Sequence, residues 1–221
     1  MITTTTLEGP QTRINAGGPV VFIVDEDVSV RDSLDELAHG AGWQAQTFAS
    51  AREFLAHPRP AVPGCLILDV DLPDGSGLDL HRRMAAERPH LPVIFMTGHA
   101  DIWMSVQAMK AGAVDFLTKP FRRELLLAAI GQALERSRRT LERESKMRVL
   151  RGSYARLTRR EREVMALVVS GLLNKQVGGE LGISEVTVKA HRGQVMRKMK
   201  ADSLPALVNM VAMLGPAMPT A

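Results

Sequence analysis

The sequence predicts an α/β protein, in which a doubly wound five-stranded parallel sheet is followed by a long linker helix and a small all-helical domain. Between residues 19 and 135, short apolar runs alternate five times with helical segments, the pattern of repeated βαβ units. Charge also divides the chain: residues 19–130 carry 10 basic and 15 acidic residues, whereas residues 131–221 carry 17 and 8. Two domains with different partners are therefore expected, and the basic one is suited to nucleic acid.

The five expected strands are short and apolar. Residues 20–24 form a continuous apolar run, as is typical of a strand that is buried on both faces. The lone cysteine, Cys65, opens a similar run at 65–69, so we expect a buried thiol and neither a disulfide nor a multi-cysteine metal site. The remaining strands are expected at 43–48, 93–97 and 114–118.

Helices are expected between these strands and throughout the basic half. In the first domain they cover 28–41, a short segment after the Ser50–Glu53 capping box, 78–88 and 101–111. In the second domain they begin at the Thr158–Glu161 capping box, at Asn174, after Ser184 and at Ser203.

A single long helix is expected to join the two domains. Residues 122 to about 150 contain no proline, and Gly131 is the only helix breaker. The apolar stripe of this helix fades where arginine and glutamate take over, so it is either a weak coiled coil or a solvated tether. Gly152 and Ser153 are expected to end it. The expected organisation is a disordered tail at 1–18, the sheet domain at 19–135, the helical linker at 136–153 and the second domain at 154–221.

Polar residues stand at the carboxyl ends of four expected strands. The first strand is followed by Asp25 and Glu26, the third ends in Asp69, the fourth ends in Thr97, and Lys119 follows the fifth. Because ligands of doubly wound sheets bind at this edge, the side chains are expected to converge. Three carboxylates would repel one another without a cation, and all-oxygen ligands suit Mg²⁺. The hydroxyl and the ammonium group complete a site for a phosphoryl group.

Residues 19–135 resemble the receiver domains of two-component response regulators. The resemblance rests on the acidic pair, on Asp69 before the loop Leu72-Pro73-Asp74-Gly75-Ser76-Gly77, on Thr97-Gly98-His99, on Ala111-Gly112-Ala113 and on Phe116-Leu117-Thr118-Lys119-Pro120-Phe121. It implies a flavodoxin-like fold and a role for Asp69 as the acceptor of phosphate from the phosphohistidine of a sensor kinase.

The resemblance also implies a metal site around this aspartate. Glu26, Asp69 and the backbone carbonyl of Asp71 would bind Mg²⁺ or Mn²⁺, with Asp25 contributing through water. The chain departs from many receivers at Glu26, where aspartate is common, and one extra methylene could shift the metal geometry. Asp71 lies at the rim of the pocket, where the family tunes the lifetime of the phosphate.

Three further residues take on roles by the same resemblance. Thr97 and Lys119 would contact the phosphoryl oxygens, and Phe116 would be the aromatic residue that switches between two positions. The bond between Lys119 and Pro120 would be a cis peptide. His99, like Asp71, occupies a rim position.

Residues 157–214 resemble the four-helix DNA-binding domain of the LuxR/NarL class. The resemblance rests on Leu157-Thr158-Arg159-Arg160-Glu161-Arg162-Glu163-Val164, Gly171, Asn174-Lys175, Leu181-Gly182-Ile183-Ser184 and Thr187-Val188-Lys189-Ala190-His191. Together with the first domain, it makes the chain similar to FixJ- and StyR-like regulators. The resemblance implies a helix-turn-helix that binds double-stranded DNA as a dimer.

Helical spacing sorts the residues after Ser184 into two faces. Val188, His191, Val195 and Met199 are expected to pack inward, whereas Lys189, Ala190, Gly193 and Arg197 fall away from them and face a major groove. We expect Lys189 to read a base edge and Ala190 to touch a thymine methyl group. Phosphate contacts are expected from Lys175, Thr187, Arg192 and Lys198.

Three glycines lie inside the helices of this domain. Gly178 and Gly179 fall in the scaffold helix and Gly193 in the recognition helix, and each costs about 1 kcal/mol relative to alanine in a helix interior. We therefore expect a marginally stable DNA-binding domain that becomes ordered on DNA. Gly193 also removes a side chain where relatives often read a base.

The residues and the resemblances together predict a cytoplasmic transcription factor that is not an enzyme and is gated by phosphorylation of Asp69. Its expected partners are a sensor histidine kinase, double-stranded DNA and, once phosphorylated, a second copy of itself; no membrane is involved. Two alternatives remain. One is an atypical regulator that binds DNA without phosphorylation. The other is a phosphatase, because Leu68-Asp69-Val70-Asp71 contains an Asp-x-Asp motif.

Overall fold

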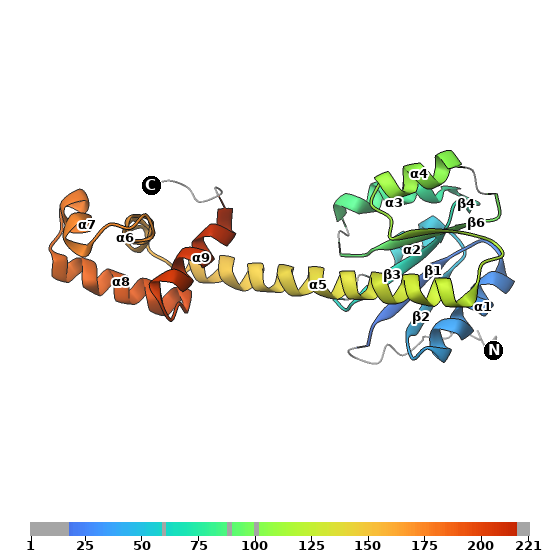
Figure 1. Ribbon diagram of the computed structural model, residues 1–221, viewed down its shortest axis with the longest axis horizontal. Coiled ribbons are helices and arrows are strands. Elements are labelled where there is room, and N and C mark those ends of the chain that lie inside the picture. Colours follow the sequence, from blue (N-terminus) through green and yellow to red (C-terminus); the bar gives the residue numbers. More distant parts are fainter. Residues whose placement is uncertain (1–17, 59–60, 88–89, 100–101, 216–221) are drawn as a thin grey trace, which may run out of the picture. The chain divides into compact units, whose positions relative to one another are not determined.

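The computed structural model describes residues 18–215, apart from 59–60, 88–89 and 100–101, so the tail expected at 1–18 lies almost wholly outside it. The chain divides into two compact units, Met1–Leu141 and Glu142–Ala221. Both are drawn in Figure 1. Each unit has its own buried core. This agrees with the two domains predicted from the change from alternating strands and helices to helices alone and from the change in net charge.

The first unit is built on a five-stranded parallel sheet, as predicted. Its strands are β1 (Val20–Val24), β2 (Gln44–Phe48), β3 (Gly64–Asp69), β6 (Val93–Thr97) and β7 (Asp115–Thr118). They are ordered β2-β1-β3-β6-β7, and every neighbouring pair is parallel. This is the flavodoxin-like order, in which the connections reverse direction between β1 and β3 and leave a crevice at their carboxyl ends.

Helices cover both faces of this sheet (Figure 1). On one face, α1 (Val28–Gly40) and the start of α5 (Arg123–Ala155) enclose a core that includes Ile23, Leu34 and Ile130. On the other face, α2 (Ala51–Ala56), α3 (Gly77–Glu87) and α4 (Ile102–Lys110) enclose Phe22, Phe54 and Leu80. Cys65 is buried in β3, as predicted, and burial raises the pKa of its thiol.

Two features of the first unit were not predicted. The Pro/Gly loop after Asp69 contains a small antiparallel hairpin, formed by β4 (Asp71–Leu72) and β5 (Gly75–Ser76). Helix α5 is anchored by the buried Ser137 hydroxyl, which donates to the His90 carbonyl at 2.6 Å and accepts from the Gly64 amide at 3.1 Å. This pair of bonds holds α5 to the beginnings of two strands.

The end of α5 was predicted wrongly. The helix continues through Gly152 and Ser153 to Ala155. Ser153 is buried, so its packing supports the helix at this point, and Gly152 is accommodated inside the helix although nothing lies near it.

The second unit contains α6 (Arg159–Val169), α7 (Asn174–Leu181), α8 (Glu185–Met199) and α9 (Leu204–Leu214), besides the end of α5. Their boundaries follow from the caps that the sequence predicts. Thr158 and Glu161 form a complete capping box, and the Ser184 and Ser203 side chains accept from backbone amides of the helices that follow them. Gly182 ends α7 with φ of 65°, which leads into a tight turn before α8.

Candidate functional site

The carboxyl edge of the sheet holds a compact group of charges. Asp25 follows β1 and is fully buried, and Asp69 ends β3 with 6% of its surface exposed. The ammonium group of Lys119, beyond β7, donates to Asp25 Oδ2 and to Asp69 Oδ2, at 2.6 Å in each case. Three residues that lie up to 94 positions apart in the sequence therefore meet at the edge where they were expected.

The protonation behaviour of this group follows from its burial. Burial raises the pKa of Asp25, and the neighbouring Asp69 adds to this, although Lys119 and the Asp27 amide act against it. Burial also acts to lower the pKa of Lys119, but its bonds to the two carboxylates outweigh that effect and the pKa is raised. Lys119 is thus held as a cation that offsets part of the negative charge of the two carboxylates.

Gly77 holds the end of β3 against the hairpin that follows it. The Gly77 amide donates to the Val70 carbonyl at 2.8 Å, and a Cβ atom at Gly77 would overlap the backbone carbonyl oxygen of Asp69. Only glycine permits this approach. The Asp71 amide donates to Asp69 Oδ1 at 3.2 Å and so helps to orient the Asp69 carboxylate.

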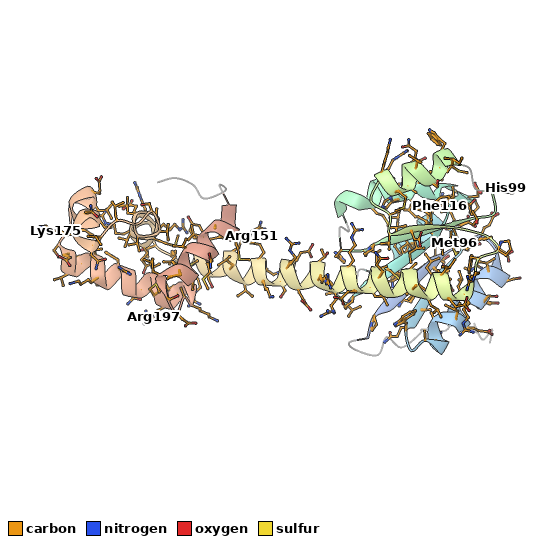
Figure 2. All side chains as sticks on the ribbon, in the orientation of Figure 1. Met96, His99, Phe116, Arg151, Lys175 and Arg197 are labelled. Carbon is orange, nitrogen blue, oxygen red and sulfur yellow. The ribbon has the colours of Figure 1, made fainter. Side chains whose placement is uncertain are left out.

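The neighbouring strand ends carry a hydroxyl and a half-buried aromatic ring. Thr97 is buried, and its hydroxyl oxygen accepts a bond from the His99 amide at 3.1 Å. Phe116 on β7 lies with its ring centroid 6.3 Å from that of Phe95 on β6. Figure 2 shows Phe116 and Met96 on this part of the sheet and His99 in the loop beyond it.

The donor set fits a small divalent cation. Asp25 and Asp69 already place one carboxylate oxygen each on a common cation, the Lys119 ammonium group. Glu26, the next residue in the chain after Asp25, has an exposed side chain. Among the residues that the structure describes, no three acidic, histidine or cysteine side chains are arranged to hold a metal ion, and the ammonium group of Lys119 occupies the position between the two buried carboxylates. Oxygen ligands of this kind suit Mg²⁺.

The second unit presents a basic helix face. Val188, Val195 and Met199 are buried, so the opposite side of α8 is exposed. The side chains expected to face a groove, those of Lys189, Ala190 and Arg197, and the open position at Gly193 all lie on that exposed side. Lys189 pairs with Glu185 at 3.1 Å one turn earlier. Figure 2 labels Arg197 on this helix and Lys175 on α7.

The four expected phosphate contacts differ in how freely they are exposed. Lys175 and Thr187 are exposed at the beginnings of α7 and α8. Arg192 is half-buried and donates to the Asn174 side chain at 3.2 Å, which links the two helices. Lys198 is also half-buried, and it donates to both carboxylate oxygens of the buried Glu161 at 2.8 and 2.6 Å. Lys198 is therefore engaged within the unit.

Comparison with known proteins gives two matches that together cover most of the chain. Residues 21–131 match the response regulator receiver domain, and residues 155–211 match the luxR family of bacterial regulatory proteins. The chain belongs to the response-regulator family. It is similar to Nodulation protein W of Bradyrhizobium diazoefficiens, at 49% identity over 89% of this chain and 86% of that protein. It is likewise similar to the transcriptional regulatory protein FixJ of Azorhizobium caulinodans, at 42% identity over 88% of this chain and 92% of the relative.

A solved response regulator shares the fold of both domains. The structure of the response regulator StyR matches with a TM-score of 0.80 and 46% identity, over 88% of this chain and 98% of that one. The present response regulator thus combines a receiver domain with a LuxR-type DNA-binding domain, as the sequence motifs indicate. No helix in the described part of the chain is both long and apolar enough to cross a membrane.

Sequence reasoning missed contacts that position these residues. Asp74, in the loop after β3, accepts bonds from the Ala51 and Arg52 amides at 3.1 and 2.8 Å and so caps α2 from outside that helix. The Arg31 guanidinium donates to the Asp25 and Glu26 carbonyls at 2.6 and 3.0 Å. Neither contact has a signal in the sequence, because each depends on how the loops fold back. The glycine at 77, which ends a turn-rich loop, could have been found from its position.

Proposed function

We propose that Asp69 is the phosphoryl acceptor of this response regulator and that its phosphorylation controls dimerisation and sequence-specific binding to DNA. The proposal rests above all on the geometry of Asp69: a nearly buried carboxylate at a strand end, beside a second buried carboxylate, with both held by one ammonium group. Structural aspartates of a stable core have no need of this arrangement, whereas phosphoryl transfer needs a fixed nucleophile and charges in place before the reaction.

The chemistry needs a phosphorylated histidine of a sensor kinase as donor. An oxygen of the Asp69 carboxylate attacks the phosphorus atom, the bond from phosphorus to the imidazole nitrogen breaks, and the imidazole leaves with the bonding electron pair. An acyl phosphate forms on Asp69. Lys119, already 2.6 Å from the carboxylate, is placed to contact the oxygens of the transferred group. The buried Thr97 hydroxyl donates to the same group after its hydrogen bond from the His99 amide breaks.

The metal site belongs to this proposal. Asp25, Glu26, Asp69 and the backbone carbonyl of Asp71 would hold Mg²⁺ or Mn²⁺. The ion supplies positive charge to the phosphoryl oxygens when it is bound. The Asp71 amide and the Arg31 guanidinium orient the acidic residues by binding Asp69 Oδ1 and the two carbonyls after β1.

The receiver surface supports pairing of two copies after phosphorylation. Helix α4 exposes apolar side chains that include Ile102, at 85% exposure, and Trp103, at 63%. Movement of Thr97 and Phe116 toward the new phosphate alters the loop and strand on either side of α4, and two such surfaces then bury each other. We propose that the paired DNA-binding domains contact two half-sites, with Lys189, Ala190, Gly193 and Arg197 in the groove and Lys175, Thr187, Arg192 and Lys198 near phosphates. The protein would act in the cytoplasm.

Intact-mass measurement tests the acceptor. The full chain is incubated with Mg²⁺ and acetyl phosphate, alongside Asp69→Asn and the control Asp71→Asn, which changes the carboxylate two residues along the chain and keeps its backbone carbonyl. We expect one phosphoryl addition in the parent and the control and none in Asp69→Asn. Addition to Asp69→Asn would overturn the assignment. No addition to the folded parent would favour a regulator that acts without phosphorylation, and rapid release of inorganic phosphate with turnover would favour the phosphatase.

Sedimentation tests the pairing surface. We expect the phosphorylated parent to dimerise and Ile102→Asp to stay monomeric while it still accepts phosphate. Leu173→Asp, which changes an exposed apolar residue on the DNA-binding domain, serves as control and should dimerise. Dimerisation of phosphorylated Ile102→Asp would exclude α4 from the interface.

A further inference from the structure

One line of residues on α8 lies opposite the buried side of the helix. The buried side is formed by Val188, Val195 and Met199. Helical spacing of 3.6 residues per turn places Val186, Ala190, Gly193 and Arg197 on the line farthest from these three. This is the line that enters a major groove most deeply when a recognition helix docks.

The first three members of that line are small and apolar. Val186 is 75% exposed, Ala190 is exposed, and a Cβ atom at Gly193 would meet nothing within 4 Å. We call Val186, Ala190 and Gly193 the apolar strip. A single exposed valine is ordinary on a protein surface, but a strip without polar side chains at the centre of a DNA-reading face restricts what can be read.

Polar side chains lie beside the strip rather than on it. Lys189 is adjacent, and its ammonium group is held by Glu185 at 3.1 Å. Arg197 follows near the end of the helix, where it donates to Gln194. In the amino-terminal half of α8, Lys189 borders the strip on one side and the exposed Thr187 borders it on the other, next to a surface that can make only van der Waals contacts.

We propose that the apolar strip recognises the C5-methyl groups of thymine in the major groove. The methyl group of thymine is the one apolar group that the standard bases expose there, and it is the natural partner of alanine and valine side chains. Gly193 lets the helix backbone come close to the bases, since no side chain stands between them. Lys189 would fix the register by binding one neighbouring base edge. This inference rests on the proposed DNA binding by α8 and adds Val186 to the residues that set specificity.

Selection of binding sites from random duplex DNA at fixed salt, followed by base replacement, tests the inference. We expect selected half-sites to contain thymine at the positions that face α8. Replacing those thymines by uracil removes only the methyl group and should weaken binding about 4-fold for each buried methyl. Replacing the thymine–adenine pair by cytosine–guanine should weaken binding similarly, and 5-methylcytosine should restore much of the loss.

Two variants connect the effect to the strip. Val186→Ala should bind thymine and uracil duplexes more nearly alike, because it removes the side chain that contacts the methyl group. Lys175→Ala, the matched control at an expected phosphate contact, should weaken binding to both duplexes equally and leave the ratio between them unchanged. Unchanged discrimination in Val186→Ala would show that the strip does not face the methyl groups.

The outcomes separate this inference from the function on which it rests. Failure of the phosphorylated protein to bind any duplex would overturn the proposed DNA binding itself. Salt-dependent, sequence-selective binding with no preference for thymine over uracil would leave the proposed function intact and overturn the inference.

Discussion

Two lysines of this response regulator show how its two sites differ. Lys119 holds two nearly buried carboxylates in the receiver domain, and its own side chain is 22% exposed. Lys189 also holds a carboxylate, that of Glu185, but both partners stand in solvent, at 62% and 46% exposure. The buried carboxylates of the receiver site therefore already share a cation from within the folded domain. The exposed face of α8 has its charges in solvent, as the proposed DNA contacts require.

Replacement of the two lysines by methionine tests this comparison most strongly. Lys119→Met leaves two buried carboxylates without a counter-charge and should destabilise the receiver by about 4 kcal/mol in the absence of divalent cations. Lys189→Met should change the stability of its domain by less than about 0.5 kcal/mol, because exposed ion pairs contribute little. Trp43 and Trp103 both lie in the first unit, so urea denaturation followed by tryptophan fluorescence reports on the receiver. Hydrogen exchange of α6–α9 reports on the other domain.

Added Mg²⁺ provides the control for the first of these variants. A divalent cation can replace the missing ammonium charge, so Lys119→Met should recover stability with Mg²⁺ more than the parent does. A Lys119→Met receiver as stable as the parent in the absence of divalent cations would show that Lys119 does not stabilise the buried carboxylates of Asp25 and Asp69.

Two glycine-to-alanine changes at the same edge of the sheet compare a glycine that is packed against the backbone with one that is only a neighbour of a site residue. A Cβ atom at Gly77 would overlap the Asp69 carbonyl, whereas one at Gly98, beside Thr97, would meet nothing within 4 Å. We expect Gly77→Ala to destabilise the receiver by about 3 kcal/mol and to slow phosphorylation, because the acceptor strand must move. Gly98→Ala should retain both properties. Denaturation and the initial rate of mass gain with acetyl phosphate measure them, and equal phosphorylation rates would remove Gly77 from the positioning of Asp69.

The receiver fold and its charged site were largely predictable because their signals are local. A buried strand shows as an apolar run, and the residue that follows it lies at the carboxyl edge, so the order of Asp25, Asp69, Thr97 and Lys119 along the chain was enough to bring them together. The cis bond before Pro120, expected by resemblance, is present. The contacts of Asp74 were not predictable, since they join residues 22 and 23 positions apart. Those of Arg31 are closer in the sequence, but they depend on the exact path of the backbone after β1.

The DNA-binding domain was predictable in its helices but less so in its packing. Caps fixed the helix starts, and the spacing after Ser184 identified the buried residues Val188, Val195 and Met199 of α8, whereas His191, expected with them, is half-buried. The same reasoning treated Lys198 as a phosphate contact without seeing its buried partner Glu161, because nothing local links α6 to α8. It also treated Gly178 as a defect in α7, whereas a Cβ atom there would lie 2.8 Å from the Ile183 carbonyl oxygen. Gly178 is a packing requirement of the turn.

The buried pair of Glu161 and Lys198 makes the DNA-binding domain sensitive to acid. Burial opposes ionisation of Glu161, but bonds from Lys198 and Thr158 outweigh it and lower the pKa of this carboxyl. A carboxyl whose pKa is lower in the folded than in the unfolded chain adds stability that is complete above the unfolded pKa, near 4.3, and is lost as pH falls through the folded pKa. Glu161→Gln should therefore cost about 2 kcal/mol at pH 7 and less at pH 3.

Hydrogen exchange of α6–α9 as a function of pH measures this contribution. Glu163→Gln is the matched control. Glu163 lies on the same helix and also forms ion pairs, with Arg159 and Arg160, but its side chain is more exposed than that of Glu161. The control should shift stability by much less. If Glu161→Gln were less stable than the parent by the same amount at pH 3 and at pH 7, Glu161 could not be the charged group that stabilises the folded domain.

The smallest expected effects come from the two adjacent glycines of α7, and they should have opposite signs. Gly178→Ala places a methyl group against the Ile183 carbonyl and should destabilise the DNA-binding domain by about 1 kcal/mol. Gly179→Ala meets open space and should stabilise it by about 0.5–1 kcal/mol, because alanine favours the helix. Hydrogen exchange of α7 measures both. If both substitutions stabilised the domain, the turn between α7 and α8 would have to move to make room for the methyl group at position 178. The close approach of Gly178 to the Ile183 carbonyl would then not be required for stability.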